Sequence, residues 1–208
     1  LWVPICSSAM FDPQVMLDMA NNGMFVVQTY GSTETCGDGI INYAQDAKHI
    51  GAVGQGNDYL EYKLEPDGEL CMRGDSIMLG YYKDPEATAE VIDADGWFHT
   101  GDLARKDEDG YYFLIGRKKS LIILGSGENV SPEELEGIVG KCEAVKECIV
   151  KEMGQKIGVV VYCDEDKQPA VRDFIIEANR TLPLYKRMSA VEFRTEPLPR
   201  NAMGKLLR

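Results

Sequence analysis

Apolar residues recur at intervals of three and four in three stretches of the chain, which predicts three amphipathic helices. The first begins at Asp12 and ends at Gly23, because Asp suits the capping position, Pro13 the first helical position and Gly the position just past the end. The second begins at Ser131, and the third spans residues 168–182. The expected buried positions are Val15, Met16, Met19, Ala20, Leu135, Ile138, Val139, Cys142, Val171, Phe174, Ile175 and Ala178.

The second helix has the strongest start signal. Ser131 supplies the cap, Pro132 fits the first helical position, and Glu134 stands where a capping box requires an acidic residue. In such a box the side chains at the two ends of the first turn each bond the backbone N–H of the other. A shorter capped helix is expected at residues 84–90.

Short β-prone runs separated by turn residues predict the strands. They lie at residues 24–28, 59–64, 69–73, 111–115, 146–151, 157–163 and 190–194. Asp-Gly pairs at 67–68, 95–96 and 109–110 each predict a hairpin, since this pair favours the tight turns that join antiparallel strands. Residues 121–130 form a hairpin-like stretch that carries two glycines.

Together these elements predict a mixed α/β fold. Residues 1–36 are expected to be a helix and a strand from an α/β sheet, and residues 37–117 a small, strongly bent β-subdomain; residues 118–208 form a compact α+β domain. Because Leu1 falls within an element and residues 1–36 hold too few strands for a sheet, we expect a piece of a longer protein. Its cut edge would be exposed and apolar, and would favour self-association.

Charge and hydropathy narrow the classes of function. The net charge is −12, which argues against a nucleic-acid or anionic membrane surface, because such surfaces need clustered Lys and Arg. No apolar run is long enough to span a bilayer, and no secretory signal is recognised. A cytoplasmic location is therefore expected.

The six cysteines are irregularly spaced and form no CxxC pair. In a chain without a secretory signal this pattern indicates reduced thiols. The two histidines, His49 and His99, are far apart in the sequence, so no tetrahedral metal site is expected. A thiol nucleophile stays open as an alternative to small buried cysteines.

The stretch QTYGSTET, residues 28–35, follows an apolar run and combines an aromatic ring, a glycine, hydroxyls and a carboxylate. One interpretation is a strand that ends at a turn. The other is a ligand site at the carboxyl end of a strand, where open α/β sheets bind ligands. Three further stretches allow the same two interpretations: GWFHTGDL at 96–103, GRKKSLIILGSGEN at 116–129 and PRNAMGK at 199–205.

The order and spacing of these four stretches resemble the C-terminal half of the adenylate-forming superfamily, over nearly the whole chain. That superfamily includes acyl-CoA synthetases, peptide-synthetase adenylation domains and beetle luciferases. The segment GRKKSLIILGSGENVSPEELE is most similar to acyl-CoA synthetases of the fatty-acid type. Peptide-synthetase domains usually carry an aspartate where Lys119 stands.

The resemblance implies a two-step reaction. A carboxylic acid, expected to be a fatty acid, and ATP with Mg²⁺ form an acyl-adenylate and pyrophosphate; the thiol of CoA then displaces AMP. The roles implied for the residues follow from the matching motifs. Tyr30 would stack on adenine, Gly31 would let the ligand approach the backbone, Thr33 would bond the phosphates and Glu34 would hold Mg²⁺. Asp102 and Arg117 would hold the ribose, and Lys205 would place a positive charge between the acid and the α-phosphate.

The same resemblance implies a mobile C-terminal domain. Lys119 matches the hinge position about which this domain turns between the two steps, although Lys118 beside it is equally charged. The loop with Gly127, Glu128 and Asn129 would then replace Lys205 and line the channel for the pantetheine arm of CoA.

Two alternatives stay open. The first is a ligase for aryl, amino or other acids that loads a carrier protein. The second is a non-catalytic nucleotide-binding or interaction module. The phosphate-binding loop of the superfamily would lie upstream of this chain, as would most of the acid pocket, so we expect residues 1–208 alone to form no adenylate.

Overall fold

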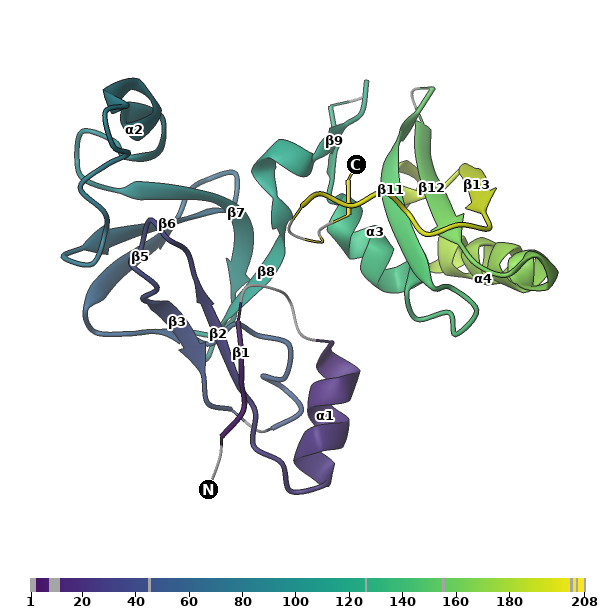
Figure 1. The fold of residues 1–208 in the computed structure, drawn as a ribbon, viewed down its shortest axis with the longest axis horizontal. Coiled ribbons are helices and arrows are strands. Elements are labelled where there is room, and N and C mark those ends of the chain that lie inside the picture. Colours follow the sequence, from purple (N-terminus) through teal and green to yellow (C-terminus); the bar gives the residue numbers. More distant parts are fainter. Residues whose placement is uncertain are drawn as a thin grey trace. The chain divides into compact units, whose positions relative to one another are not determined.

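The computed structural model describes residues 3–7, 12–44, 46–125, 127–154, 156–202, 204 and 206–207. The chain divides into two compact units, Leu1–Lys118 and Lys119–Arg208 (Figure 1). Both units combine helices with strands, so the predicted mixed α/β fold class is confirmed. No described helix has the length and apolar character needed to cross a membrane.

The first unit begins with a four-stranded sheet in the order β1-β2-β3-β4. These strands are β1 (Ile5–Cys6), β2 (Val27–Gly31), β3 (Gly39–Asn42) and β4 (Gln55–Gly56). β1 and β2 run parallel, and the other pairs are antiparallel. The helix α1 (Pro13–Asn21) links β1 to β2 and is capped by the Asp12 carboxylate, as the sequence predicts. On the edge strand β1 the side chain of Ile5 is 69% exposed.

The predicted strand at 24–28 is wrong by three residues at each end, because β2 spans Val27–Gly31. Its pairing explains the shift. Gln28 to Gly31 form a continuous ladder with β3, so the first residues of the QTYGSTET stretch belong to a strand, and the loop begins only at Ser32. Tyr30 and Gly31 are therefore held by the sheet.

A second, antiparallel sheet follows in the order β5-β6-β7-β8. Its strands are β5 (Leu60–Leu64), β6 (Glu69–Gly74), β7 (Phe98–Lys106) and β8 (Tyr112–Arg117). The short helix α2 (Pro85–Val91) lies between β6 and β7 in the chain and is capped by Asp84. Strand β7 contains the TGDL residues and is absent from the predicted strands. The ladders on both sides of it contain register shifts, at Glu69/Cys71 and at Leu103/Ala104.

Two of the three Asp-Gly pairs lie in the predicted hairpins, between β5 and β6 and between β7 and β8. The third, Asp95-Gly96, lies in a turn closed by a single bridge between Ile92 and Phe98. The Asp93 carboxylate accepts hydrogen bonds from the backbone N–H groups of Asp95 and Trp97. This turn therefore joins a helix to a strand, and the prediction of a full hairpin there is wrong.

The second unit contains the hairpin β9 (Ile122–Ile123) and β10 (Asn129–Val130), and a sheet with the order β11-β12-β13. The sheet consists of β11 (Glu147–Met153), β12 (Lys156–Tyr162) and β13 (Ala190–Arg194). Helices α3 (Pro132–Val139) and α4 (Gln168–Thr181) pack their apolar residues against one of its faces (Figure 1). Val159 and Val161 face this core, and Val160 packs with Leu198 on the opposite face, so β12 is buried on both sides.

The capping box predicted for α3 forms only in part. Ser131 Oγ accepts the backbone N–H of Glu134 at 3.3 Å, as expected. The Glu134 carboxylate instead accepts two hydrogen bonds from Lys186 Nζ, at 2.7 and 2.8 Å. The start of α3 is thereby tied to the short 3₁₀ turn Leu184–Lys186, a long-range contact that local sequence signals do not reveal.

A polar cluster around His49 ties the loop after β3 to the β7–β8 hairpin. The imidazole contacts Asp46 and, at 3.0 Å, Asp109, and it stacks on the ring of Tyr111. The hydrogen bond to Asp46 and the contact with Asp109 raise the pKa of His49, while Lys48 and His49 lower the pKa of Asp109. The cluster is therefore fully charged between the pKa values of the carboxylates and that of the imidazole.

This cluster predicts a pH-dependent contribution to stability. Since the pKa of His49 is raised on folding, its contribution is complete below the unfolded value of about 6.5 and is lost as pH rises through the folded pKa. The difference in unfolding free energy between wild type and His49→Gln should be constant below about pH 6.5 and shrink as the pH rises above that value. NMR titration of the imidazole, assigned against His99→Gln, gives the folded pKa directly; a value at or below the unfolded one would contradict the prediction.

Candidate functional site

Tyr30, Asp102 and Arg117 meet where β2 ends and where β7 and β8 pair. The Tyr30 hydroxyl donates to Asp102 Oδ2 at 2.7 Å, and Arg117 Nε lies 2.9 Å from Asp102 Oδ1. Asp102 and Arg117 are direct partners in the β7–β8 ladder, so the backbone sets their spacing. The structure thus brings together three predicted site residues that are up to 87 positions apart.

The surroundings fix the protonation of Tyr30. Burial, and next the negative charge of Asp102, raise the pKa of its hydroxyl far above the ordinary value. The phenol therefore stays a hydrogen-bond donor at every physiological pH. Asp102 is buried, whereas the Arg117 side chain is 64% exposed and leaves N–H groups facing solvent. The cluster presents an aromatic ring, a carboxylate and a guanidinium next to one another.

The loop that follows β2 is closed on itself by Thr35. Its buried hydroxyl contacts the backbone N–H of Ser32 at 3.0 Å and the carbonyl oxygen of Asp38 at 2.5 Å. Gly37 has a φ of 80°, a backbone conformation that favours glycine. Thr33 is exposed at the tip, and its carbonyl accepts the N–H of Cys36. The loop is therefore a compact turn that holds Thr33 in solvent.

Packing of the loop after β2 requires a glycine at position 31. A Cβ placed on it would lie 2.6 Å from the carbonyl oxygen of Asp38, which is backbone and cannot move aside. The family resemblance implies that this glycine admits a ligand; the structure shows that the loop needs it to close. That leaves its role toward a ligand as a prediction.

Gly31→Ala should therefore destabilise the first unit. Overpacking against backbone costs about 1–3 kcal/mol of unfolding free energy. Thermal or chemical denaturation measures this loss, with Gly137→Ala in α3 as the control. A Cβ at Gly137 meets nothing within 4 Å, and the helix should gain about 0.5–1 kcal/mol. Equal effects of the two substitutions would contradict the close-contact argument.

Glu34 is held from two sides. Its Oε1 accepts a hydrogen bond from the Tyr81 hydroxyl at 2.8 Å, and its backbone carbonyl accepts the N–H of Met78 at 2.7 Å. Burial opposes its ionisation, but the hydrogen bond from Tyr81 and other nearby donors outweigh burial and lower its pKa. Tyr81 in turn is fixed by Thr88 of α2, whose Oγ1 accepts the Tyr81 N–H at 2.9 Å. Glu34 is thus an oriented carboxylate that is ionised at neutral pH.

The two lysines of the GRKK stretch differ in their surroundings. Lys118 Nζ lies 2.7 Å from Asp67 and 2.8 Å from the buried carboxylate of Glu69, and these partners raise its pKa. Lys119 is exposed and makes no ion pair with any residue that the structure describes. The division between the two units falls between them. The structure therefore distinguishes two residues that the sequence left equivalent.

The glycine-bearing loop lies at the tip of the β9–β10 hairpin. Gly127 has a φ of 94° and donates its N–H to the carbonyl of Leu124, and Glu128 accepts the N–H of Leu124. Asn129 is exposed in β10, opposite Ile123. Glu128 Oε2 is shielded from solvent and meets no hydrogen-bond partner within the described chain. Gly127 and Glu128 thus lie before β10 at the tip of the hairpin, and Asn129 is the first residue of β10.

Lys205 lies outside the described residues. The residues around it are anchored to the second unit: Arg200 pairs with Glu147 of β11 at 2.6 Å and donates to the carbonyl of Gly204. Glu147 also accepts the N–H of Leu198 at 2.8 Å. The chain just before Lys205 is therefore attached to Glu147, the first residue of β11.

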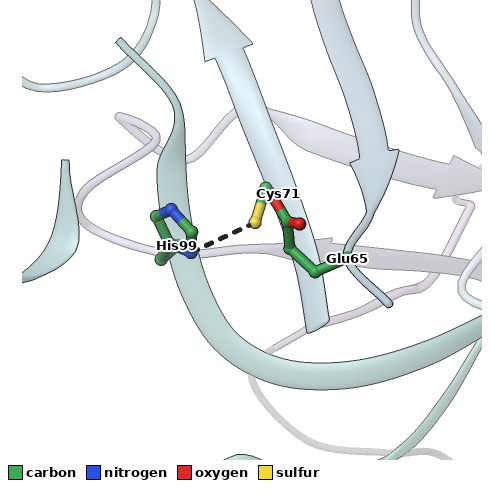
Figure 2. Close-up of side chains that lie close together, drawn as sticks. All are labelled: Glu65, Cys71 and His99. Atoms are coloured by element: carbon green, nitrogen blue, oxygen red, sulfur yellow. Dashed lines mark hydrogen bonds between the residues drawn. The ribbon is translucent and has the colours of Figure 1, made fainter. Parts of the chain in front are cut away.

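A second polar cluster was not predicted from the sequence. Cys71 Sγ lies 3.4 Å from His99 Nδ1, and the Glu65 carboxylate is close to both (Figure 2). His99 Nδ1 also lies 3.2 Å from Glu69 Oε2. Burial, and next the charge of Glu69, raise the pKa of Cys71 to about 12, so its free thiol is protonated and does not fit a nucleophile.

The remaining cysteines that the structure describes are also free thiols. Burial raises the pKa of Cys148 to about 12 as well. These observations favour the interpretation of reduced cysteines, three of which are buried, over that of a catalytic thiol.

No family model matches the chain. A long-chain-fatty-acid–CoA ligase from Salmonella typhimurium is 38% identical over 200 residues, which cover 89% of this chain and 35% of that protein. A feruloyl-CoA synthase from Amycolatopsis is 34% identical and covers 98% of this chain and 44% of its own length. The solved o-succinylbenzoate coenzyme A synthetase from Bacillus subtilis, in complex with ATP and magnesium ion, matches with a TM-score of 0.84 and 27% identity, over 98% of this chain and 45% of that one. The chain thus spans less than half the length of these relatives.

Proposed function

Nearly the whole chain is similar to the C-terminal part of adenylate-forming acyl-CoA ligases, and from this premise we propose that it is part of an ATP-dependent acyl-CoA synthetase. In the proposed reaction a carboxylate oxygen attacks the α-phosphorus of ATP and pyrophosphate leaves. The thiol of CoA then attacks the acyl carbon, and AMP leaves as the thioester forms. The observation that carries the proposal is the Tyr30–Asp102–Arg117 cluster, which three of the four ordered stretches of the sequence build from three different strands.

This cluster suits a nucleoside. The Asp102 carboxylate can accept both ribose hydroxyls, as acidic residues do in other nucleotide sites, and the exposed guanidinium of Arg117 offers donors to the same sugar. The ring of Tyr30 offers a face for adenine. The hydrogen bond from Tyr30 to Asp102 orients both groups before a ligand arrives, which lowers the entropic cost of binding.

Glu34 fits a ligand of Mg²⁺. The ion prefers carboxylate oxygens and usually binds together with substrate phosphates, and the ionised, oriented Glu34 carboxylate meets that requirement. Bound there, Mg²⁺ would neutralise charge on the phosphates. Exposed Thr33, one residue earlier, would donate its hydroxyl to the same phosphates.

The second unit is proposed to supply Lys205 for adenylate formation and the loop of Gly127, Glu128 and Asn129 for the CoA step. Lys119 is the proposed hinge, because the ion pairs of Lys118 hold the chain to the first unit up to that residue. Gly127 would border the pantetheine arm, where a side chain would obstruct a narrow channel.

For the acid we propose a fatty acid, since the Salmonella relative carries that name at 38% identity. An aromatic acid is the second candidate, favoured by the feruloyl-CoA synthase at 34% identity. We further propose that residues 1–208 alone form no adenylate and that the protein acts in the cytoplasm.

Carboxylate-dependent exchange of pyrophosphate into ATP tests the proposal. The complete protein should exchange with one class of acid among short, medium and long fatty acids and aromatic acids, and residues 1–208 alone should not. Exchange followed by CoA-dependent release of AMP supports a synthetase. Nucleotide binding without exchange, for every acid tried, would overturn the ligase and favour the non-catalytic module. Transfer of the acyl group to a carrier protein but not to CoA would favour the carrier-loading ligase.

Tyr81→Phe should weaken the use of Mg²⁺ by the complete protein. Loss of an orienting hydrogen bond to a metal ligand typically costs 10- to 100-fold in metal affinity or activity, so the half-saturating Mg²⁺ concentration should rise by roughly 10-fold. Tyr82→Phe, an exposed neighbour, is the matched control. The measurement is exchange rate against Mg²⁺ concentration; equal curves for the two variants would contradict a positioning role.

A further inference from the structure

The side chains of Glu65, Cys71 and His99 lie close together in the second sheet, where β5, β6 and β7 are neighbours (Figure 2). Their ligand-type atoms all lie within 4.8 Å of one another. Cys71 and His99 are direct cross-strand partners of β6 and β7, and Glu65 follows the last residue of β5. We propose that these three residues form a binding site for Zn²⁺, with the fourth coordination position open to water.

The donor set favours zinc among the biological divalent ions. Thiolate and imidazole ligands suit Zn²⁺, whereas Mg²⁺ and Ca²⁺ prefer oxygen alone. Three protein ligands with an open fourth position are a common zinc arrangement. The 3.4 Å separation of Cys71 Sγ and His99 Nδ1 is close to the edge of a tetrahedron with Zn–S of about 2.3 Å and Zn–N of about 2.0 Å.

The other nitrogen of His99 gives a second, independent indication. Nε2 faces Asp93 Oδ2 at 3.5 Å, while Nδ1 is the nitrogen that points to Cys71. A histidine that binds a metal usually donates its remaining ring N–H to a carboxylate, which orients the ring and makes the free nitrogen more basic. Asp93 itself is fixed by the N–H groups of Asp95 and Trp97, so this partner is in place before any ion arrives.

Two carboxylates and two lysines complete the surroundings. Glu65 Oε1 lies 2.6 Å from Lys63, which leaves its second oxygen for an ion. Glu69, at 3.2 Å from His99 Nδ1, is already bonded to Lys118 and to the N–H of Gly101, so it keeps partners if an ion takes the nitrogen. The site adjoins a pocket of about 390 Å³ that provides a route from solvent; its lining residues are Glu65, Pro66, Asp67, Glu69, His99 and Lys118.

Such an ion would brace strand β7. Asp102 lies three residues after His99 on the same strand, and it contacts Tyr30 and Arg117. A bond from His99 through the ion to β6 would fix the strand that positions this carboxylate. The inference concerns residues of the first unit only and does not depend on the proposed function.

Cobalt titration of the purified chain tests the site. Co²⁺ replaces Zn²⁺ and gives a charge-transfer absorption only when a thiolate binds it, so the band excludes the oxygen-rich cluster of His49 and Asp109. We expect one equivalent of Co²⁺ with this band, displacement by one equivalent of Zn²⁺, and loss of the band in Cys71→Ser. Asp93→Asn should keep the band and weaken affinity by roughly 10-fold.

Controls separate the site from adventitious binding. Cys36→Ser removes an exposed thiol and His49→Gln the other histidine, and both should leave the titration unchanged. If circular dichroism shows that Cys71→Ser does not fold, the same cobalt titration is made on His99→Gln, because the His99 side chain is more exposed than that of Cys71. This variant should bind Co²⁺ at least 10-fold more weakly. Three results would overturn the site: no band in the wild-type chain, a band that survives in folded Cys71→Ser, or a band that is lost in Cys36→Ser.

Discussion

Asp102→Asn is expected to weaken ATP binding by the complete protein roughly 10- to 100-fold, because a hydrogen bond to a charged group contributes about 1.5–3 kcal/mol. Asparagine keeps the shape of the side chain but replaces one acceptor oxygen by a donor. It can then no longer accept from Tyr30, Arg117 and two ribose hydroxyls together. Isothermal titration with ATP measures the loss.

The same substitution should also act on stability, which separates two roles of the residue. Losing the charge-assisted bonds of a buried carboxylate costs about 1–3 kcal/mol of unfolding free energy. Asp58→Asn, on an exposed turn, is the control and should change neither quantity. Unchanged ATP affinity with a large loss of stability would assign Asp102 to folding alone and would contradict its role toward the ribose.

Lys205→Ala is expected to lower the rate of adenylate formation roughly 100- to 1,000-fold, the usual effect of removing one preorganised group that stabilises developing charge. Attack of a carboxylate on a phosphate brings two anions together, and a compact ammonium on a flexible stem offsets their repulsion. Pyrophosphate exchange in the complete protein measures this step. Exposed Lys141→Ala is the control for loss of a lysine from the same unit.

The second step distinguishes a specific role of Lys205 from general damage. If Lys205 serves only the first step, the variant should convert chemically prepared acyl-adenylate and CoA to thioester at nearly the wild-type rate. Equal losses in both steps would contradict that role. A variant of the loop, Gly127→Val, should show the opposite pattern, with exchange retained and thioester formation reduced.

Local signals in the sequence predicted most of the helices because caps and spacing act within a few residues. Asp12, Asp84 and Ser131 cap their helices as expected. Strand β7 escaped prediction because His-Thr-Gly-Asp has weak strand preference, and pairing with β6 and β8 on either side makes it a strand. Glu134 was misassigned for the same reason, since Lys186, 52 residues away, takes its carboxylate.

The candidate site, too, could be predicted from the sequence only in part. The resemblance of four stretches indicated Tyr30, Asp102 and Arg117, and the structure brings these three together. The wide spacing of the two histidines gave no indication that cross-strand pairing would bring Cys71, 28 residues away, opposite His99. Hydrogen-bond partners such as Tyr81 were missed because no local pattern links residues 47 positions apart.

The ion pairs of Lys118 hold the end of β8 to the start of β6. Arg117 is the last residue of β8, and Lys118 secures the next position to Asp67 and Glu69, on the turn before β6 and at its start. Lys118 therefore holds the residue next to Arg117 to the first unit, and if Lys119 is the hinge as proposed, rotation of the second unit would begin one residue beyond these ion pairs. If Arg117 holds the nucleotide as proposed, Lys118, which is assigned no contact with substrate, would keep such a rotation from displacing the arginine.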